Sequence, residues 1–242
     1  KFTLSSSANL GDTITGGGGN DSIVIDTSGD LTKADSVDGG AGTDTLSATG
    51  DATIADIDLT GVSNFEKLTG LATTFISATF DTLAQATGIN EVTFLDSDTD
   101  DADSLTLKAG YTSAITVNLD DALTGSLNTV DASAYVGDGL TVKSNFENLD
   151  ATTSFSAITG SANTNDVFQL STGATTSNAG TGPNVAQTKI LNFETFSIVD
   201  GAVGTAATNK FVWANEGASY TNSSTYQTVT IDASTITASD TP

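Results

Sequence analysis

The chain has 242 residues, with 30 acidic residues, seven lysines and no arginine, and its net charge is −23 at pH 7. This charge excludes the basic face that a nucleic-acid-binding protein needs, and it opposes adsorption to anionic lipid. The sequence has no His, Cys or Met, so disulfide frameworks, thiol nucleophiles and histidine-based triads or zinc sites are excluded. No apolar run approaches the roughly 18 residues of a transmembrane helix. We therefore expect no nucleic-acid partner, no membrane insertion and no enzymatic activity.

Two glycine-rich nonapeptides lie in the N-terminal part of the chain, GGGGNDSIV at 16–24 and GGAGTDTLS at 39–47. Both match G-G-x-G-x-D-x-U-x, where U is a large apolar residue, a repeat typical of calcium-binding parallel β-rolls. The glycines permit tight turns with positive φ that expose backbone carbonyls. The aspartate adds a hard oxygen ligand that suits Ca²⁺. Two copies make this a specific signal for a Ca²⁺ site.

The aspartates of this region share one register. Asp12 and Asp21 are nine residues apart, as are Asp35 and Asp44, and an apolar residue follows each aspartate by two positions. Because successive turns of a β-roll alternate sides, the turn at 16–21 should stack on the turn at 39–44. The turn that ends at Asp12 should stack on the longer turn that contains Asp30 and Asp35.

The predicted Ca²⁺ ligands fall into three groups. The two full nonapeptides supply the strongest candidates, and the turns without glycine supply weaker ones. The acidic stretch DSDTDDAD at 96–103 forms either an irregular Ca²⁺-binding loop or a solvated turn, and the sequence does not decide between them. An EF-hand is excluded there, because its sixth position is Asp101 and its twelfth is Leu107. In chain order the candidates are Asp12, Gly16, Gly17, Gly19, Asp21, Asp30, Asp35, Gly39, Gly40, Gly42, Asp44, Asp96, Asp98 and Asp100.

Little helix is expected. Residues 80–88 predict one short helical turn, with Asp81 as N-cap and Gly88 as the stop signal. Residues 173–188 are predicted to form a loop.

A second element recurs as SNFEKL at 63–68, SNFENL at 144–149 and LNFETF at 191–196. Its alternation of apolar and polar residues predicts strands. We expect a structural role for Glu66, Glu147 and Glu194, through hydrogen bonds to a neighbouring coil, in preference to metal ligation. A third echo, SANLGDTIT at 7–15 and SANTNDVFQ at 161–169, indicates that the second segment is a degenerate coil opening. Such irregular echoes indicate an eroded β-solenoid.

The predicted fold is therefore all-β: a calcium-binding β-roll over 1–60 that continues into a right-handed, irregular parallel β-solenoid over 61–200. The last segment, 201–242, is less regular and contains Trp213 and two tyrosines. It is interpreted as a terminal cap, or else as an assembly surface. Lys1 in place of an initiating Met suggests a mature fragment or an excerpt of a longer protein.

The stretch 9–47 resembles the RTX (repeats-in-toxin) β-roll family, through GGGGNDSIV and GGAGTDTLS. The later N-F-E phrases, together with the short acidic phrases VDAS at 130–133, LDAT at 149–152 and IDAS at 231–234, are similar to the β-solenoid body of bacterial surface-layer proteins and large adhesins. This resemblance implies type I secretion, folding triggered by extracellular Ca²⁺, and a structural role at the cell surface. It also implies that turn carbonyls and turn aspartates bind the ion between stacked turns.

The sequence thus predicts an extracellular, calcium-dependent structural protein that self-assembles as a homo-oligomer, in a surface layer or filament. Two alternatives stay open. The chain could be an adhesin or carbohydrate-binding segment that contacts cell-surface polysaccharide through its late aromatic residues, or a polysaccharide-modifying enzyme on a β-helix.

Overall fold

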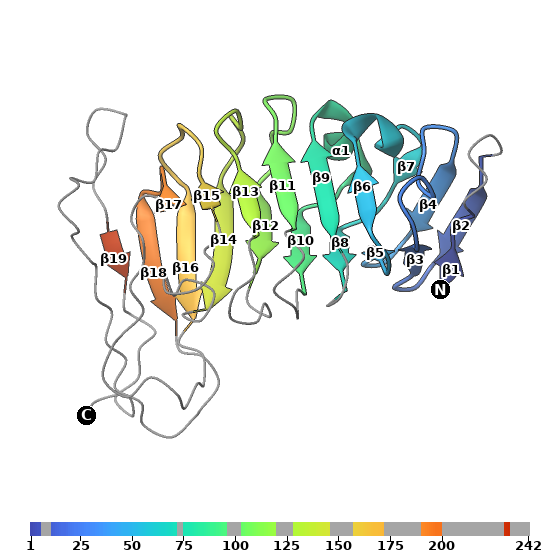
Figure 1. Ribbon diagram of the computed structural model, residues 1–242, viewed down its shortest axis with the longest axis horizontal. Helices are drawn as coiled ribbons and strands as arrows, with labels where there is room; N and C mark the ends of the chain where they lie inside the picture. The colour runs from blue at the N-terminus through green and yellow to red at the C-terminus, as the bar shows by residue number, and fades with distance from the viewer. Residues whose placement is uncertain are drawn as a thin grey trace, which may run out of the picture.

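The structure is a computed structural model that describes residues 1–5, 11–71, 75–95, 103–119, 128–145, 157–171, 190–199 and 230–232. Nearly all regular structure in these residues is β-strand, and the strand pairs between them are parallel. Successive strands of each sheet come from successive coils of the chain, which stack along one axis (Figure 1). The predicted parallel β-solenoid is confirmed.

The largest sheet has ten strands and runs the length of the described solenoid. It passes residue 60 without a break, because Thr45 pairs with Lys67 and Leu46 with Leu68. In spatial order its strands are β1 (Phe2–Thr3), β3 (Ser22–Ile25), β5 (Thr45–Ala48), β8 (Lys67–Gly70), β10 (Glu91–Phe94), β12 (Ile115–Asn118), β14 (Leu140–Asn145), β16 (Val167–Ser171), β18 (Thr195–Val199) and β19 (Thr230–Asp232).

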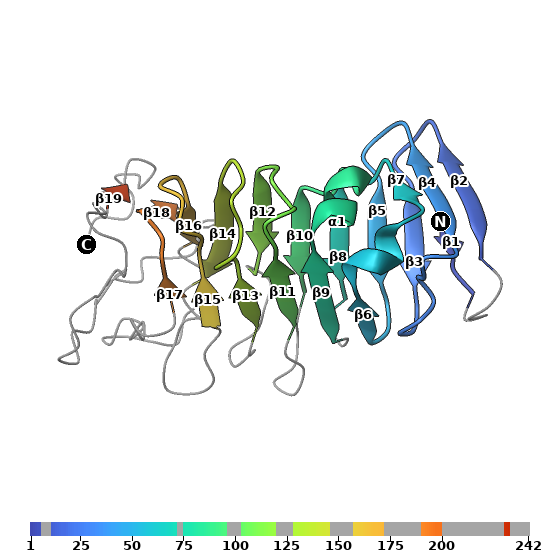
Figure 2. The same ribbon diagram turned by 90° about the horizontal axis from the view of Figure 1, so that it is seen from above.

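Two smaller sheets complete the cross-section (Figure 2). The three-stranded sheet, at the N-terminal end, contains β2 (Thr13–Gly17), β4 (Ser36–Gly40) and β7 (Val62–Ser63). The six-stranded sheet contains β6 (Ala52–Ile54), β9 (Ile76–Phe80), β11 (Ser104–Leu107), β13 (Thr129–Asp131), β15 (Ala157–Thr159) and β17 (Ile190–Leu191). The first coil thus has two strands, β2 and β3, and a third strand position enters with β6.

The core is a stack of apolar side chains in register. Strand alternation places every second residue inward, and one inward row of the ten-stranded sheet is apolar from coil to coil and fully or almost fully buried. This row consists of Ile23, Leu46, Leu68, Val92, Val117, Val142 and Phe168. The apolar residues that follow the aspartates by two positions pair between coils as predicted, Ile14 with Val37 and Ile23 with Leu46. Each such side chain contributes roughly 1.5–3 kcal/mol on burial.

Aromatic rings form a second stack inside the later coils. The ring centroids of Phe80 and Tyr111 are 5.7 Å apart, and those of Tyr111 and Tyr135 are 6.3 Å apart. Both hydroxyls donate to backbone carbonyls, Tyr111 to Ile89 and Tyr135 to Ser113. Burial, and then the neighbouring Tyr135, raise the pKa of Tyr111, and burial raises the pKa of Tyr135.

Helix is confined to two short elements in the described residues, η1 (Asp56–Leu59) and α1 (Thr82–Thr87). Gly88 ends α1 with φ of 95°, as predicted. Asp81 is the N-cap residue, as predicted, but its side chain makes no capping hydrogen bond. Asp56, one coil earlier, accepts hydrogen bonds from the amides of Asp81, Leu83 and Ala84 at 2.8, 3.1 and 2.8 Å. The α1 terminus therefore depends on a contact between coils.

The coils lengthen along the chain. The amide of Asp21 bonds to a carboxylate 23 residues later, whereas the amide of Asp166 bonds to one 28 residues later. None of the described helices is both long and apolar enough to span a bilayer. The predicted loop at 173–188 and all but 230–232 of the predicted terminal segment 201–242 lie outside the described residues.

Candidate metal centre

The two glycine-rich turns stack directly on each other, as predicted. Strand β2 pairs with β4 so that Gly17 lies opposite Gly40, and β3 pairs with β5 so that Ser22 lies opposite Thr45. Between these strands, the Ala41 amide donates to the Gly17 carbonyl at 2.7 Å. The two turns therefore form two layers of one structure.

Glycine is required at the first position of each turn because the next coil lies too close for a side chain. A Cβ on Gly16 would lie 2.2 Å from the Gly39 carbonyl oxygen, and a Cβ on Gly39 would lie 2.1 Å from the Asn64 carbonyl oxygen. At the second position the backbone conformation requires glycine in both turns, since φ is 120° at Gly17 and 96° at Gly40, and the same holds at the fourth position of the second turn, where Gly42 has φ of 144°.

The aspartate of each turn folds back toward the first glycine of the same turn. Oδ2 of Asp21 and Oδ2 of Asp44 each lie 2.8 Å from the position that a Cβ on Gly16 or Gly39, respectively, would occupy. Asp44 is fully buried; its Oδ1 accepts the Asp21 amide at 2.6 Å, whereas its Oδ2 has no hydrogen-bond partner. The Asp21 carboxylate receives no hydrogen bond from the described residues either.

An acceptor-only cradle results at the first turn. The Gly39 carbonyl oxygen and Asp21 Oδ2 lie 2.2 and 2.8 Å from the position that a Cβ on Gly16 would occupy. Asp21 is half-buried, and neither of these two oxygens has a hydrogen to donate. One carboxylate and one carbonyl oxygen are hard ligands of the kind that Ca²⁺ takes. These two ligand types therefore fit the predicted Ca²⁺ ion.

The aspartates outside the full nonapeptides are engaged differently. Asp12 accepts the Ser5 amide at 2.7 Å, and its own amide donates to Oδ1 of Asp35 at 2.7 Å, so the predicted stacking of these two turns is confirmed. Oδ2 of Asp35 also accepts the Thr32 amide at 2.6 Å. Protein donors thus already bond to the carboxylates of these two candidate ligands.

Asp30 closes a turn of its own. It is 3% exposed, and its carboxylate accepts the amides of Asp26 and Thr27 at 2.9 and 2.8 Å and the Thr27 hydroxyl at 2.7 Å. The structure does not bring Asp30 to the glycine-rich turns. Asp30 and Asp35 both follow a Thr-x-x-Asp pattern whose side chains and amides bond within the turn.

The third group of predicted ligands, Asp96, Asp98 and Asp100, lies outside the described residues. Within the described residues, no three acidic side chains gather into a metal-binding group. Any ion at the glycine-rich turns would therefore depend on backbone carbonyls and water as well as on carboxylates.

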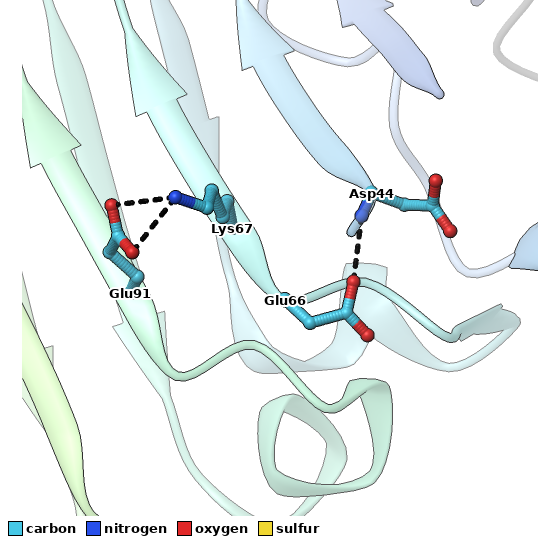
Figure 3. A network of polar contacts seen from close by, with 4 residues as sticks. All are labelled: Asp44, Glu66, Lys67 and Glu91. Atoms are coloured by element: carbon cyan, nitrogen blue, oxygen red, sulfur yellow. Dashed lines mark hydrogen bonds and ion pairs between the residues drawn. The ribbon is translucent and has the colours of Figure 1, made fainter. Parts of the chain in front are cut away.

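Glu66 links the third coil to the second, which confirms the structural role predicted for it. Its Oε2 accepts the Asp44 amide at 2.7 Å, on the opposite side from the direction in which the Asp44 carboxylate points (Figure 3). Glu194 repeats this contact with the Asp166 amide at 2.9 Å, and Glu147 lies outside the described residues. The neighbouring pair of Lys67 and Glu91 is an ion pair at 2.9 Å on the outer face, with both side chains 37% exposed, so it contributes little.

The echo at 161–169 forms a hydrogen-bonded loop. Asp166 is fully buried, and its Oδ2 accepts both the amide and the hydroxyl of Ser161 at 2.6 Å. Its Oδ1 accepts the Leu140 amide of the preceding coil at 3.1 Å. Both oxygens are thus bonded to protein donors, in contrast to those of Asp44.

Sequence reasoning missed the asparagine of the N-F-E motif. Asn64 and Asn192 have φ of 55° and 60°, in the left-handed region that asparagine tolerates better than most residues. Each turns the chain so that the following phenylalanine, Phe65 or Phe193, is fully buried. An asparagine precedes phenylalanine in each copy, and this is the signal for a turn where the apolar–polar alternation predicts a strand. The strands begin only after the glutamate, at Lys67 and Thr195.

No protein-family model, curated protein or solved structure matches the chain.

Proposed function

We propose that this chain is a calcium-dependent extracellular structural protein of the RTX type, which self-assembles into a surface layer or filament. The observation that carries the proposal is the contact between the two stacked nonapeptide turns, where Asp21 Oδ2 and the Gly39 carbonyl oxygen both lie within 3 Å of the Cβ position of Gly16. Gly16, Asp21 and Gly39 would hold the ion, and it would supply the positive charge that these oxygens lack.

Calcium would act as a condition for folding. The net charge of −23 opposes a compact state, and the buried Asp44 adds a local cost at the same turns. A ligand that binds only the folded state at about a hundred times its dissociation constant adds roughly 2.7 kcal/mol per site. Extracellular calcium modules have dissociation constants of roughly 10⁻⁴–10⁻³ M. The protein would therefore fold after it leaves the cell.

Open strand edges favour assembly. Strand β2 is the terminal strand of the three-stranded sheet, and β4 is its only partner among the described strands. An unpaired edge is a template for another chain unless it is covered. Edge-to-edge contacts between the two ends of a solenoid are heterologous, and such contacts form filaments when the rotation does not close.

Circular dichroism during a Ca²⁺ titration, followed by electron microscopy, tests this proposal. We expect a Ca²⁺-dependent gain of β-structure and ordered assemblies that a chelator dissolves. Asp21→Ala should raise the Ca²⁺ concentration at the folding midpoint. Asp138→Ala, which removes an exposed carboxylate far from the turns, is the charge-matched control and should leave the midpoint unchanged. Folding that is independent of Ca²⁺, or monodisperse monomers at millimolar Ca²⁺, would contradict the proposal.

A further inference from the structure

We propose that Asp138 is a site of spontaneous modification, where the link between Asp138 and Gly139 rearranges to an isoaspartyl linkage in the folded protein. The sequence contains three Asp–Gly pairs, at 38–39, 138–139 and 200–201. A glycine after aspartate favours this reaction, because no side chain shields the amide nitrogen that attacks. The structure gives the first two pairs opposite surroundings, and the third lies outside the described residues. The rearrangement requires no bound ion and is separate from the function proposed above.

The reaction needs no partner other than water. The amide nitrogen of Gly139 attacks Cγ of the Asp138 carboxyl group, whose hydroxyl leaves with the amide proton as water, and a cyclic imide forms. Water then opens the ring at the main-chain carbonyl of Asp138 and breaks its bond to the Gly139 nitrogen. The chain now runs through Cγ, and the former main-chain carbonyl becomes the free carboxyl group. Water is released and taken up once each, so the mass of the protein does not change.

Asp138 has the surroundings that this ring closure needs. It lies in the return connection between β13 and β14, and its side chain is exposed. No residue in the described part of the chain donates a hydrogen bond to its carboxylate. The Gly139 amide lies outside the strand ladders and donates to the Tyr135 hydroxyl at 3.2 Å. The carboxyl group can therefore turn toward the Gly139 nitrogen without losing a hydrogen bond of its own.

The pair of Asp38 and Gly39 has the same residue types in a protected setting. Both residues lie in β4, the middle strand of the three-stranded sheet, where Asp38 pairs with β2 on one side and with β7 on the other. Asp38 Oδ1 accepts the Gly40 amide at 3.0 Å and the Asn64 side-chain amide at 2.7 Å, and Gly39 is buried. Ring closure at Asp38 must first break these bonds and open the sheet, so it requires local unfolding.

The modification should loosen the contact between coils at the 132–139 connection. The Asp138 amide donates to the Thr112 carbonyl at 3.0 Å, and the Ile115 amide donates to the Gly139 carbonyl at 3.1 Å. Both bonds join this connection to the preceding coil. An isoaspartyl linkage inserts one main-chain carbon between them, so the spacing that satisfies both bonds is lost. The modified protein should therefore be less stable than the native protein in urea unfolding.

Peptide mapping after prolonged storage tests this modification. The full chain is stored at near-neutral pH, folded in the presence of Ca²⁺ and, in parallel, unfolded in urea, with circular dichroism to verify each state. Cleavage after lysine yields peptides 34–67 and 109–143, each with one Asp–Gly pair, and electron-transfer fragmentation locates the isoaspartate. In the folded protein we expect Asp138 to convert at least about tenfold faster than Asp38, which reacts only after local unfolding. In urea the two should convert at similar rates.

Asp138→Glu is the matched variant. Glutamate retains the charge, but its longer side chain would have to close a larger ring, which forms far more slowly, so the rearrangement at position 138 should disappear. Asp38→Glu makes the same change at the protected pair and should leave the conversion of Asp138 unaltered. Absence of isoaspartate at Asp138 in the folded protein, or equal rates at Asp38 and Asp138 in that state, would overturn the assignment.

Discussion

The contact between Asp56 and the start of α1 should be among the most costly polar interactions to remove. Its two carboxylate oxygens accept three backbone amides of the next coil, at 2.8, 2.8 and 3.1 Å. Hydrogen bonds to a charged group contribute about 1.5–3 kcal/mol each, and the loss of a helix cap alone costs about 0.5–2 kcal/mol. Because Asp56 is only partly buried and water can replace part of the loss, we expect Asp56→Ala to lower the free energy of unfolding by about 2–4 kcal/mol.

Urea unfolding at saturating Ca²⁺ measures this effect. With a slope of about 2 kcal/mol/M, the midpoint should fall by about 1–2 M. Asp81→Ala is the matched control, because Asp81 occupies the N-cap position but makes no side-chain capping bond; it should cost less than about 0.5 kcal/mol. Should Asp81→Ala destabilise the protein as much as Asp56→Ala, the assignment of the cap to the preceding coil would be incorrect.

Two further substitutions test the core. Phe65→Ala should destabilise the protein by about 3–5 kcal/mol, because Phe65 is fully buried. Phe2→Ala, at a side chain that is 42% exposed, should cost about 0.5 kcal/mol or less in the same urea assay. Equal losses of stability in the two variants would contradict the placement of Phe65 in the core. Burial raises the pKa of Tyr111 and Tyr135, so these tyrosines ionise at a lower pH in the unfolded state than in the folded state. Their contribution to the free energy of unfolding is therefore fully present below about pH 10 and is lost as the pH rises above it. Thermal unfolding from about pH 8 to pH 11 should show a shallower decline in Tyr111→Phe than in the native protein, and equal slopes would argue against this titration.

The register of the first two coils could be predicted because sequence and structure share one period there. Aspartates recur with an apolar residue two positions later, and the structure pairs Ile14 with Val37 and Ile23 with Leu46 accordingly. The need for glycine was equally predictable, since a close backbone approach excludes a side chain. The pairing of the 16–21 and 39–44 turns followed from these two facts.

The hydrogen-bond partners of individual carboxylates could not be predicted, because many of these donors come from other coils. Asp21 and Asp44 both stand at the aspartate position of a full nonapeptide, yet Asp44 Oδ1 accepts the Asp21 amide from the preceding coil, while no amide of the described residues bonds to the Asp21 carboxylate. Likewise Asp81 has the right sequence position for a cap, but the carboxylate of Asp56, one coil earlier, accepts the amides of Leu83 and Ala84. Contacts between coils have no local sequence signature.

The lengthening of the coils has a consequence for engineering. Residues 95–103, 119–128, 146–156 and 172–189 each join a strand of the ten-stranded sheet to the next strand of the six-stranded sheet. The return connections, such as 108–114 and 160–166, are shorter, and their amides and side chains bond to neighbouring coils. The length of the connection from the ten-stranded sheet to the six-stranded sheet therefore varies from coil to coil. Foreign peptides inserted into these connections would recur once per coil in the sequence, while insertions into the return connections would break the hydrogen bonds that those connections make.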